Sequence, residues 1–218
     1  MSRILATAAI ATALLAAPAA AQTTGTLNIF DPPNQATDAR SRLVLRDYAR
    51  CVERQRSRAV RDVLAIDYRT ARYDRTLRSI AVNEPACAGF GRLRSGRLLL
   101  AGELAEAVYL KDYGTAAVAE KMGAAGARGP LAARDEGEYA ALCTVRSAPA
   151  ASRALLDTAV ASAEERAAID ALLPNVASCV QGGARATFNR PAVRALIALA
   201  LYRTAVHAQP AASPQAGN

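Results

Sequence analysis

The chain has 218 residues and a formal net charge of +8, from 27 basic and 19 acidic side chains. Its one histidine, His207, leaves almost no room for histidine-dependent catalytic triads or for histidine-ligated metal sites, and we expect no cofactor or metal. Apolar residues make up 52% of the chain, many of them alanine, tryptophan is absent and few segments alternate like strands. We therefore expect an all-α protein with a thin core.

Residues 1–21 have the pattern of a secretory signal peptide. Arg3 precedes an apolar run over residues 4–15, and the alanines at 19–21 match the small-residue pattern of a cleavage site after Ala21. The run is too short to span a bilayer comfortably, and no later stretch of 18 apolar residues occurs. We expect a periplasmic or secreted protein whose mature chain has no transmembrane segment.

The mature chain opens with an irregular arm, residues 22–37, which contains the pair Pro32-Pro33. A helix is expected from Asp38 toward Ile66, with apolar side chains on one side.

Two further helices complete a first helical unit, residues 38–113. One covers residues 70–82 and is ended by Pro85. The other is expected to be capped by Ser95 and to run to Tyr113.

Glycine and proline punctuate residues 114–134, which we interpret as a linker. A second helical unit is expected over residues 135–207. Residues 208–218 are rich in alanine and proline and are predicted to form a disordered tail.

Local signals for helix ends are clearest in the second unit. Asp135 with Glu138, and Ser162 with Glu165, have the spacing of capping boxes at helix starts. The helix that follows Ser162 is expected to be closed by Pro174.

The other two helices of the second unit have proline near their starts. Ser147 and Pro149 are expected to open a short helix that ends at Asp157, and Asn189 is expected to cap the last helix, with Pro191 in its first turn.

The four cysteines fall into two pairs with the same spacing. Cys51 and Cys87 are 36 positions apart, as are Cys143 and Cys179. An even number of cysteines in an oxidising compartment indicates disulfides. The equal spacing favours Cys51–Cys87 and Cys143–Cys179, because a copied unit would close its own bridge. No Cys-x-x-Cys motif or nearby histidine favours a redox or metal role.

The second pair follows the first by 92 positions, and other residues recur at that offset, which becomes 93 after one inserted residue. Two tandem copies of a three-to-four-helix unit, each with one internal disulfide, are therefore expected. Pro149 then predicts a break near Ser57 in the first copy. Matched arginines are expected to brace helix junctions through bonds to carbonyls: Arg54 with Arg146, Arg61 with Arg153, and Arg97 with Arg190.

Basic residues recur every three or four positions along the first expected helix and again in the glycine-rich loop before the third. These side chains could bind an anionic partner, such as lipid phosphate, acidic polysaccharide or an acidic protein. Compositional bias is the simpler explanation, because 25 of the 27 basic residues are arginine. Export and the lack of interleaved aromatic residues argue against nucleic-acid binding. The candidates are Arg42, Arg46, Arg50, Arg54, Arg58, Arg61, Arg92 and Arg94.

Glu103 and Glu106 are three positions apart and would share one helix face. Two carboxyl groups could serve acid–base hydrolysis of a glycosidic bond. Their matches in the second unit, Leu196 and Leu199, are apolar, which indicates that this face packs inward in at least one unit.

The leading hypothesis is an exported, non-enzymatic helical repeat protein of the cell envelope, a binding or structural module of unknown ligand and partner. The first alternative is a basic adaptor for anionic envelope polymer or lipid head groups. The second is a helical hydrolase that uses the glutamate pair.

Overall fold

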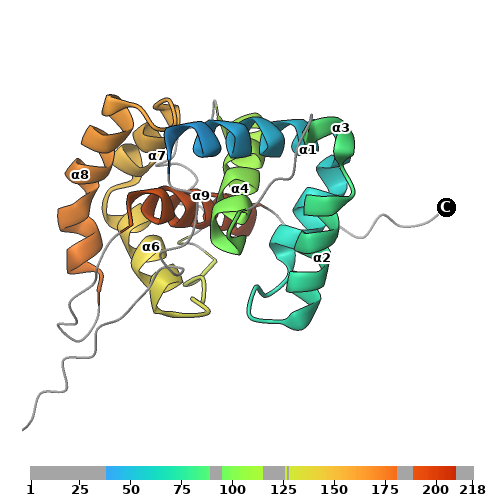
Figure 1. The fold of residues 1–218 in the computed structure, drawn as a ribbon. Helices are drawn as coiled ribbons and strands as arrows, with labels where there is room; N and C mark the ends of the chain where they lie inside the picture. The colour runs from blue at the N-terminus through green and yellow to red at the C-terminus, as the bar shows by residue number, and fades with distance from the viewer. Residues whose placement is uncertain (1–37, 89–94, 115–125, 127, 181–188, 210–218) are drawn as a thin grey trace, which may run out of the picture.

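The structure is a computed structural model, and it describes residues 38–88, 95–114, 126, 128–180 and 189–209. All the secondary structure in this part of the chain is helical (Figure 1). Several expected features lie outside the described residues: the signal peptide 1–21, the arm 22–37, most of the linker 114–134, the loop arginines Arg92 and Arg94, and nearly all of the tail 208–218.

Helix α1, Ala39–Ala65, is the longest element and is bent near its middle. The Asp38 side chain caps it by accepting a hydrogen bond from the Ser41 N–H at 2.9 Å. Arg56 has non-helical dihedral angles, φ −131° and ψ 37°, which confirms the expected break one residue before Ser57.

Helix α2, Ala71–Val82, starts at the cap Thr70, as expected. As expected, α2 ends before Pro85, and Pro85 then opens the four-residue helix α3, Pro85–Ala88. Proline suits the first turn, where its missing N–H would have no helical partner.

Helix α4, Arg97–Tyr113, is capped by Gly96. Ser95 was expected to cap this helix, and that expectation is wrong because its hydroxyl donates to the Gly96 carbonyl.

Helices α6, Glu136–Ser147, and α7, Pro149–Asp157, follow each other across Ala148 alone. The Asp135 carboxylate accepts from the Glu138 N–H at 2.9 Å, which confirms this helix start. Ser147 closes α6 rather than opening α7, so that part of the expectation is wrong.

Helix α8, Ala163–Ser178, starts as predicted, with the Ser162 hydroxyl accepting from the Glu165 N–H at 3.0 Å. Pro174 does not close it. The proline is exposed, and the helix continues because Leu172 and Val176 on its other side stay packed in the core. Helix α9, Arg190–Ala208, has Pro191 in its first turn, as expected.

Helices α4 and α9 cross at the centre of the molecule, with α1 packed along α4 and α6 packed against α9 (Figure 1). The crossing is close, since a Cβ atom added to Gly102 would lie 2.4 Å from the Ala195 Cβ atom. One hydrophobic core joins the two halves of the chain. It includes Val52 and Leu104 from the first half and Ile169 and Ile197 from the second.

Both disulfides form as the spacing predicts. Cys51 of α1 is bonded to Cys87 of α3, with the Cα atoms 5.6 Å apart. Cys143 of α6 is bonded to Cys179, at the end of α8, with the Cα atoms 5.7 Å apart. Among the described helices, none combines the length and the apolar character that crossing a membrane requires.

Candidate functional site

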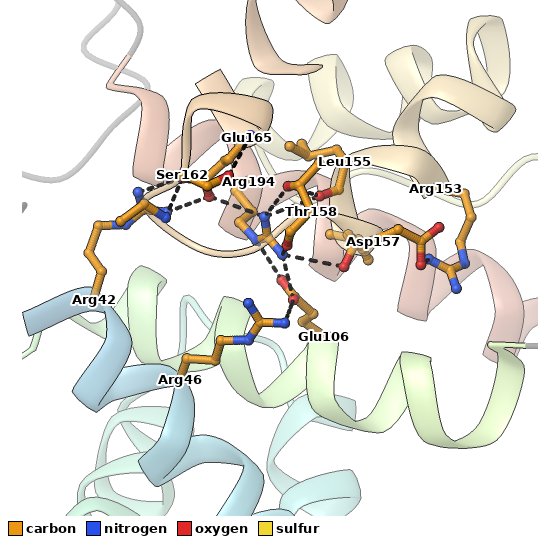
Figure 2. A network of polar contacts seen from close by, with 12 residues as sticks. Arg42, Arg46, Glu106, Arg153, Leu155, Asp157, Thr158, Ser162, Glu165 and Arg194 are labelled. Atoms are coloured by element: carbon orange, nitrogen blue, oxygen red, sulfur yellow. Dashed lines mark hydrogen bonds and ion pairs between the residues drawn. The ribbon is translucent and has the colours of Figure 1, made fainter. Parts of the chain in front are cut away.

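Charged side chains of α1, α4, α8 and α9 meet inside the molecule (Figure 2). We call this cluster the Arg–Glu network. Its members lie between 42 and 194 in the sequence, so the fold assembles it from both halves of the chain. They are Arg42, Arg46, Glu103, Glu106, Glu165 and Arg194.

Arg194 is the centre of the network and is 1% exposed. Its Nε and Nη2 atoms donate to the two oxygens of Glu106 at 2.8 and 2.7 Å, and Nη1 donates to Glu165 Oε1 at 3.1 Å. It also binds the end of α7, through the Leu155 carbonyl at 3.1 Å and the Thr158 hydroxyl at 3.0 Å. Burial alone would lower the pKa of Arg194 because it disfavours the charged form. The hydrogen bonds to Glu106 and the negative charges of Glu106 and Glu165 outweigh this effect and raise the pKa.

Glu165 links α8 to α1. Arg42 donates two hydrogen bonds to the Glu165 carboxylate, from Nη1 to Oε2 at 2.7 Å and from Nη2 to Oε1 at 2.6 Å. The Ala161 N–H also donates to Oε2 at 2.8 Å, from a residue with a φ of +63°. Burial alone would raise the pKa of Glu165, but the pKa is lowered because Arg42 and Arg194 stabilise the carboxylate.

The network is less well satisfied at Arg46 and Glu103. Arg46 Nη2 lies 3.9 Å from Glu106 Oε1. The Arg46 Nε and Glu103 Oε2 atoms are inaccessible and have no hydrogen-bond partner among the described residues. Burial, and then the nearby Glu106 carboxylate, raise the pKa of Glu103 to about 8. Glu103 is therefore mostly protonated at neutral pH.

The glutamate pair faces arginines rather than an open cleft. Neither Glu103 nor Glu106 is among the residues that line three of the cavities formed by the described part of the chain. Glu106 is 3% exposed, and both of its oxygens are held by Arg194. This arrangement ties α4 to α9, and it engages both oxygens of the Glu106 carboxylate.

The six predicted ridge arginines do not lie on one exposed surface. Arg42 and Arg46 turn inward to the Arg–Glu network, and Arg61 binds Asp112 of α4 at 2.6 Å. The other three are exposed, at positions 50, 54 and 58. Anion binding by those three stays a prediction.

The matched arginines behave partly as hypothesised. Arg97 pairs with Asp74 of α2, and Arg190 pairs with Asp170 of α8 at 2.9 Å, so both anchor the start of a central helix. Arg153 donates to the Gly114 carbonyl at the end of α4 at 3.3 Å, which is the expected kind of brace. Arg61 similarly donates to a carbonyl, that of Ser57, at 2.9 Å. The remaining pair, Arg54 and Arg146, is exposed.

Sequence reasoning missed two principal members of the network. Glu165 was recognised only as part of a capping box, and Arg194 was assigned no role. Arg194 is the one charged residue within the mostly apolar stretch 191–202, and that placement could have indicated a buried, paired cation.

Among the described residues, no group of three or more histidine, cysteine, aspartate or glutamate side chains is placed to hold a metal ion. Comparison with known proteins finds no matching family model, no similar curated protein and no similar solved structure.

Proposed function

We propose that the protein is an exported, non-enzymatic helical module of the cell envelope, built from two copies of one helical unit. In this proposal the Arg–Glu network is a tie between the copies. The observation that carries it is that both bidentate pairs cross between the halves: Arg42 binds Glu165, and Glu106 binds Arg194.

Several landmarks support a duplicated unit, because they recur at the offset of the cysteines. The bend at Arg56, with φ −131° and ψ 37°, matches Ala148, with φ −135° and ψ 60°, between α6 and α7. The caps Thr70 and Ser162 precede helices that begin 92 positions apart. Helix α9 begins 93 positions after α4, as one inserted residue requires.

Export is supported by the covalent structure. All four cysteines are in disulfides, and such bonds persist in oxidising compartments such as the periplasm. Cell fractionation of a host that expresses the full chain tests this step. We expect an oxidised protein outside the cytoplasm, with Gln22 at its N-terminus. A chain that stays in the cytoplasm with its first 21 residues attached would contradict export.

The non-enzymatic role is supported by the way Glu106 is held. General acid–base catalysis requires a carboxyl within hydrogen-bond reach of the substrate. Incubation of the oxidised protein with envelope polysaccharide should release no new reducing ends. Release by the wild type that Glu103→Gln or Glu106→Gln abolishes, while Arg166→Gln on the exposed surface retains it, would favour the hydrolase instead.

The basic adaptor remains a second candidate because Arg50, Arg54 and Arg58 are exposed along α1. If they form an anion site, changing all three to glutamine should lower the salt concentration needed to elute the protein from heparin. The matched control changes three exposed arginines of α2 to glutamine: Arg72, Arg75 and Arg78. Equal shifts for the two triple variants would show a general charge effect and would contradict a site on α1.

A further inference from the structure

A pocket of about 190 Å³ opens between the end of α1, α2, α4, α6 and α9. We call it the Tyr68–Leu199 pocket. Aliphatic side chains line much of it: Leu64, Ala101, Leu196 and Leu199. The two leucines of α9 remain partly exposed there, although most of that helix is buried. For comparison, an apolar cavity of roughly 150 Å³ is large enough to bind benzene.

The pocket is the counterpart of the Arg–Glu network under the proposed duplication, because each network residue matches a pocket residue in the other half of the chain. This comparison rests on the proposed duplication and its offsets of 92 and 93. All six network members correspond to pocket residues in this way: Arg42 to Arg134, Arg46 to Glu138, Glu103 to Leu196, Glu106 to Leu199, Glu165 to Tyr73, and Arg194 to Ala101. The central change is Arg194 to Ala101, because a large guanidinium that fills one site is replaced by a methyl group. The space left by this replacement accounts for the pocket.

Three guanidinium groups and two carboxylates line the polar side of the pocket: those of Arg97, Arg134 and Arg203, and those of Asp135 and Glu138. Arg134 and Arg203 share the carboxylate of Glu138, with Arg134 Nη1 4.0 Å from Oε1 and Arg203 bonded to the same oxygen. The Glu138 Oε2 atom also accepts from the Arg134 backbone N–H at 2.6 Å. Arg134 and Arg203 therefore share one carboxylate oxygen, while the Asp135 carboxylate accepts from the Glu138 N–H at 2.9 Å. This arrangement favours a further anion at the pocket.

Aromatic rings lie beside these cations. The Arg134 guanidinium lies over the Tyr68 ring, 5.4 Å from its centroid. Burial, and then a hydrogen bond with Asp135, raise the pKa of Tyr68, and burial raises the pKa of Tyr73 to about 12. Both phenols stay neutral at physiological pH, so neither ring adds a negative charge that would repel an anion.

We propose that the Tyr68–Leu199 pocket binds a small carboxylate with an apolar body, such as an aromatic ring or a saturated ring of similar size. The apolar body lies on Leu196 and Leu199, and the carboxylate lies at Arg134 and Arg203. The site gives the proposed binding module a class of ligand.

Isothermal titration of the oxidised mature chain with phenylacetate and cyclohexylacetate tests the proposal. We expect both to bind. Phenylacetamide lacks the carboxylate and acetate lacks the ring, so we expect each of them to bind at least about tenfold more weakly. Failure of both ring carboxylates to bind at millimolar concentration would overturn the proposal. Binding of phenylacetamide as strongly as phenylacetate would overturn the carboxylate assignment.

Variants locate the binding. Leu199→Phe should fill the pocket and weaken phenylacetate binding about tenfold or more, while Leu43→Phe, at an exposed position of α1, should leave it unchanged. Circular dichroism establishes whether each variant is folded. If Leu199→Phe does not fold, Leu196→Phe is the pocket variant used in its place. Unchanged binding in a folded pocket variant would overturn the site. These results do not depend on where the chain is located in the cell, so fractionation tests the proposed function separately.

Discussion

Gly102 of α4 lies against Ala195 of α9 so closely that a Cβ atom on the glycine would meet the alanine Cβ at 2.4 Å and its Cα at 2.5 Å. Because no real Cβ atom sits this close to backbone, only glycine permits the observed crossing. The two central helices depend on this contact for their packing.

Replacement of Gly102 by alanine should therefore destabilise the protein. Alanine normally favours a helix over glycine by about 1 kcal/mol, but the clash should reverse the sign and give a net loss of roughly 1–3 kcal/mol. Thermal unfolding measures the change. Gly126→Ala is the control, since nothing lies within 4 Å of the added atom. A Gly102→Ala protein as stable as the wild type would contradict the close crossing.

Arg194 and Glu106 give a second prediction. Arg194→Met leaves the buried Glu106 and Glu165 carboxylates without their shared cation, and we expect the free energy of unfolding to fall by about 3–5 kcal/mol. Adding Glu106→Leu removes one of these carboxylates, so the double variant should lose much less than the sum of the two single losses. Additive losses in urea unfolding would mean that the two side chains do not interact.

The raised pKa of Glu103 predicts that stability depends on pH. In the folded protein the pKa is about 8, whereas the ordinary value is 4.5, so the folded state holds the proton more tightly. The contribution of Glu103 to stability is complete below about pH 4.5 and is lost as the pH rises toward 8, by at most about 1.4 kcal/mol per pH unit.

Glu103→Gln removes this titration because glutamine stays neutral. Relative to the wild type, the variant should gain stability progressively between pH 5 and pH 8 in urea unfolding, and the gain should level off above pH 8. A wild type and variant whose stabilities change in parallel over that range would show that Glu103 is not buried against the Arg–Glu network.

Parts of the fold that depend on local spacing could be predicted from sequence. Equal cysteine spacing gave the correct disulfide pairs, and Asp135 and Ser162 were recognised as helix caps because their partners lie three residues away. Rules based on neighbouring residues gave wrong helix ends where packing against the core determines the length of a helix. Pro174 does not end α8, because its apolar neighbours stay in the core, and Gly96 rather than Ser95 caps α4.

The charged site could not be predicted, because its partners are far apart in the sequence. Arg42 looked like part of a basic surface, yet its partner Glu165 is 123 positions away. The proposed repeat did indicate that Glu103 and Glu106 differ from their leucine matches, Leu196 and Leu199. It could not indicate which of the two environments would be packed with ion pairs and which would line a pocket.

The two disulfides should contribute similarly to stability. Each joins residues 36 positions apart, so the chain entropy removed from the unfolded state is about the same. Changing Cys51 and Cys87 together to serine should lower the free energy of unfolding by about 2–5 kcal/mol, and the same change at Cys143 and Cys179 should have a comparable effect. Chemical denaturation measures both. If removal of either disulfide leaves the free energy of unfolding unchanged, that disulfide does not stabilise the fold.

Ion pairs and a shared core join the two halves of the chain, so we expect the protein to unfold as one cooperative body. Hydrogen exchange measured by mass spectrometry across a urea titration of the oxidised protein tests it most directly, because peptides from α2 and α8 report on the two halves separately. We expect both helices to lose protection at the same urea concentration and with the same urea dependence. Loss of protection in one half while the other remains folded would contradict it.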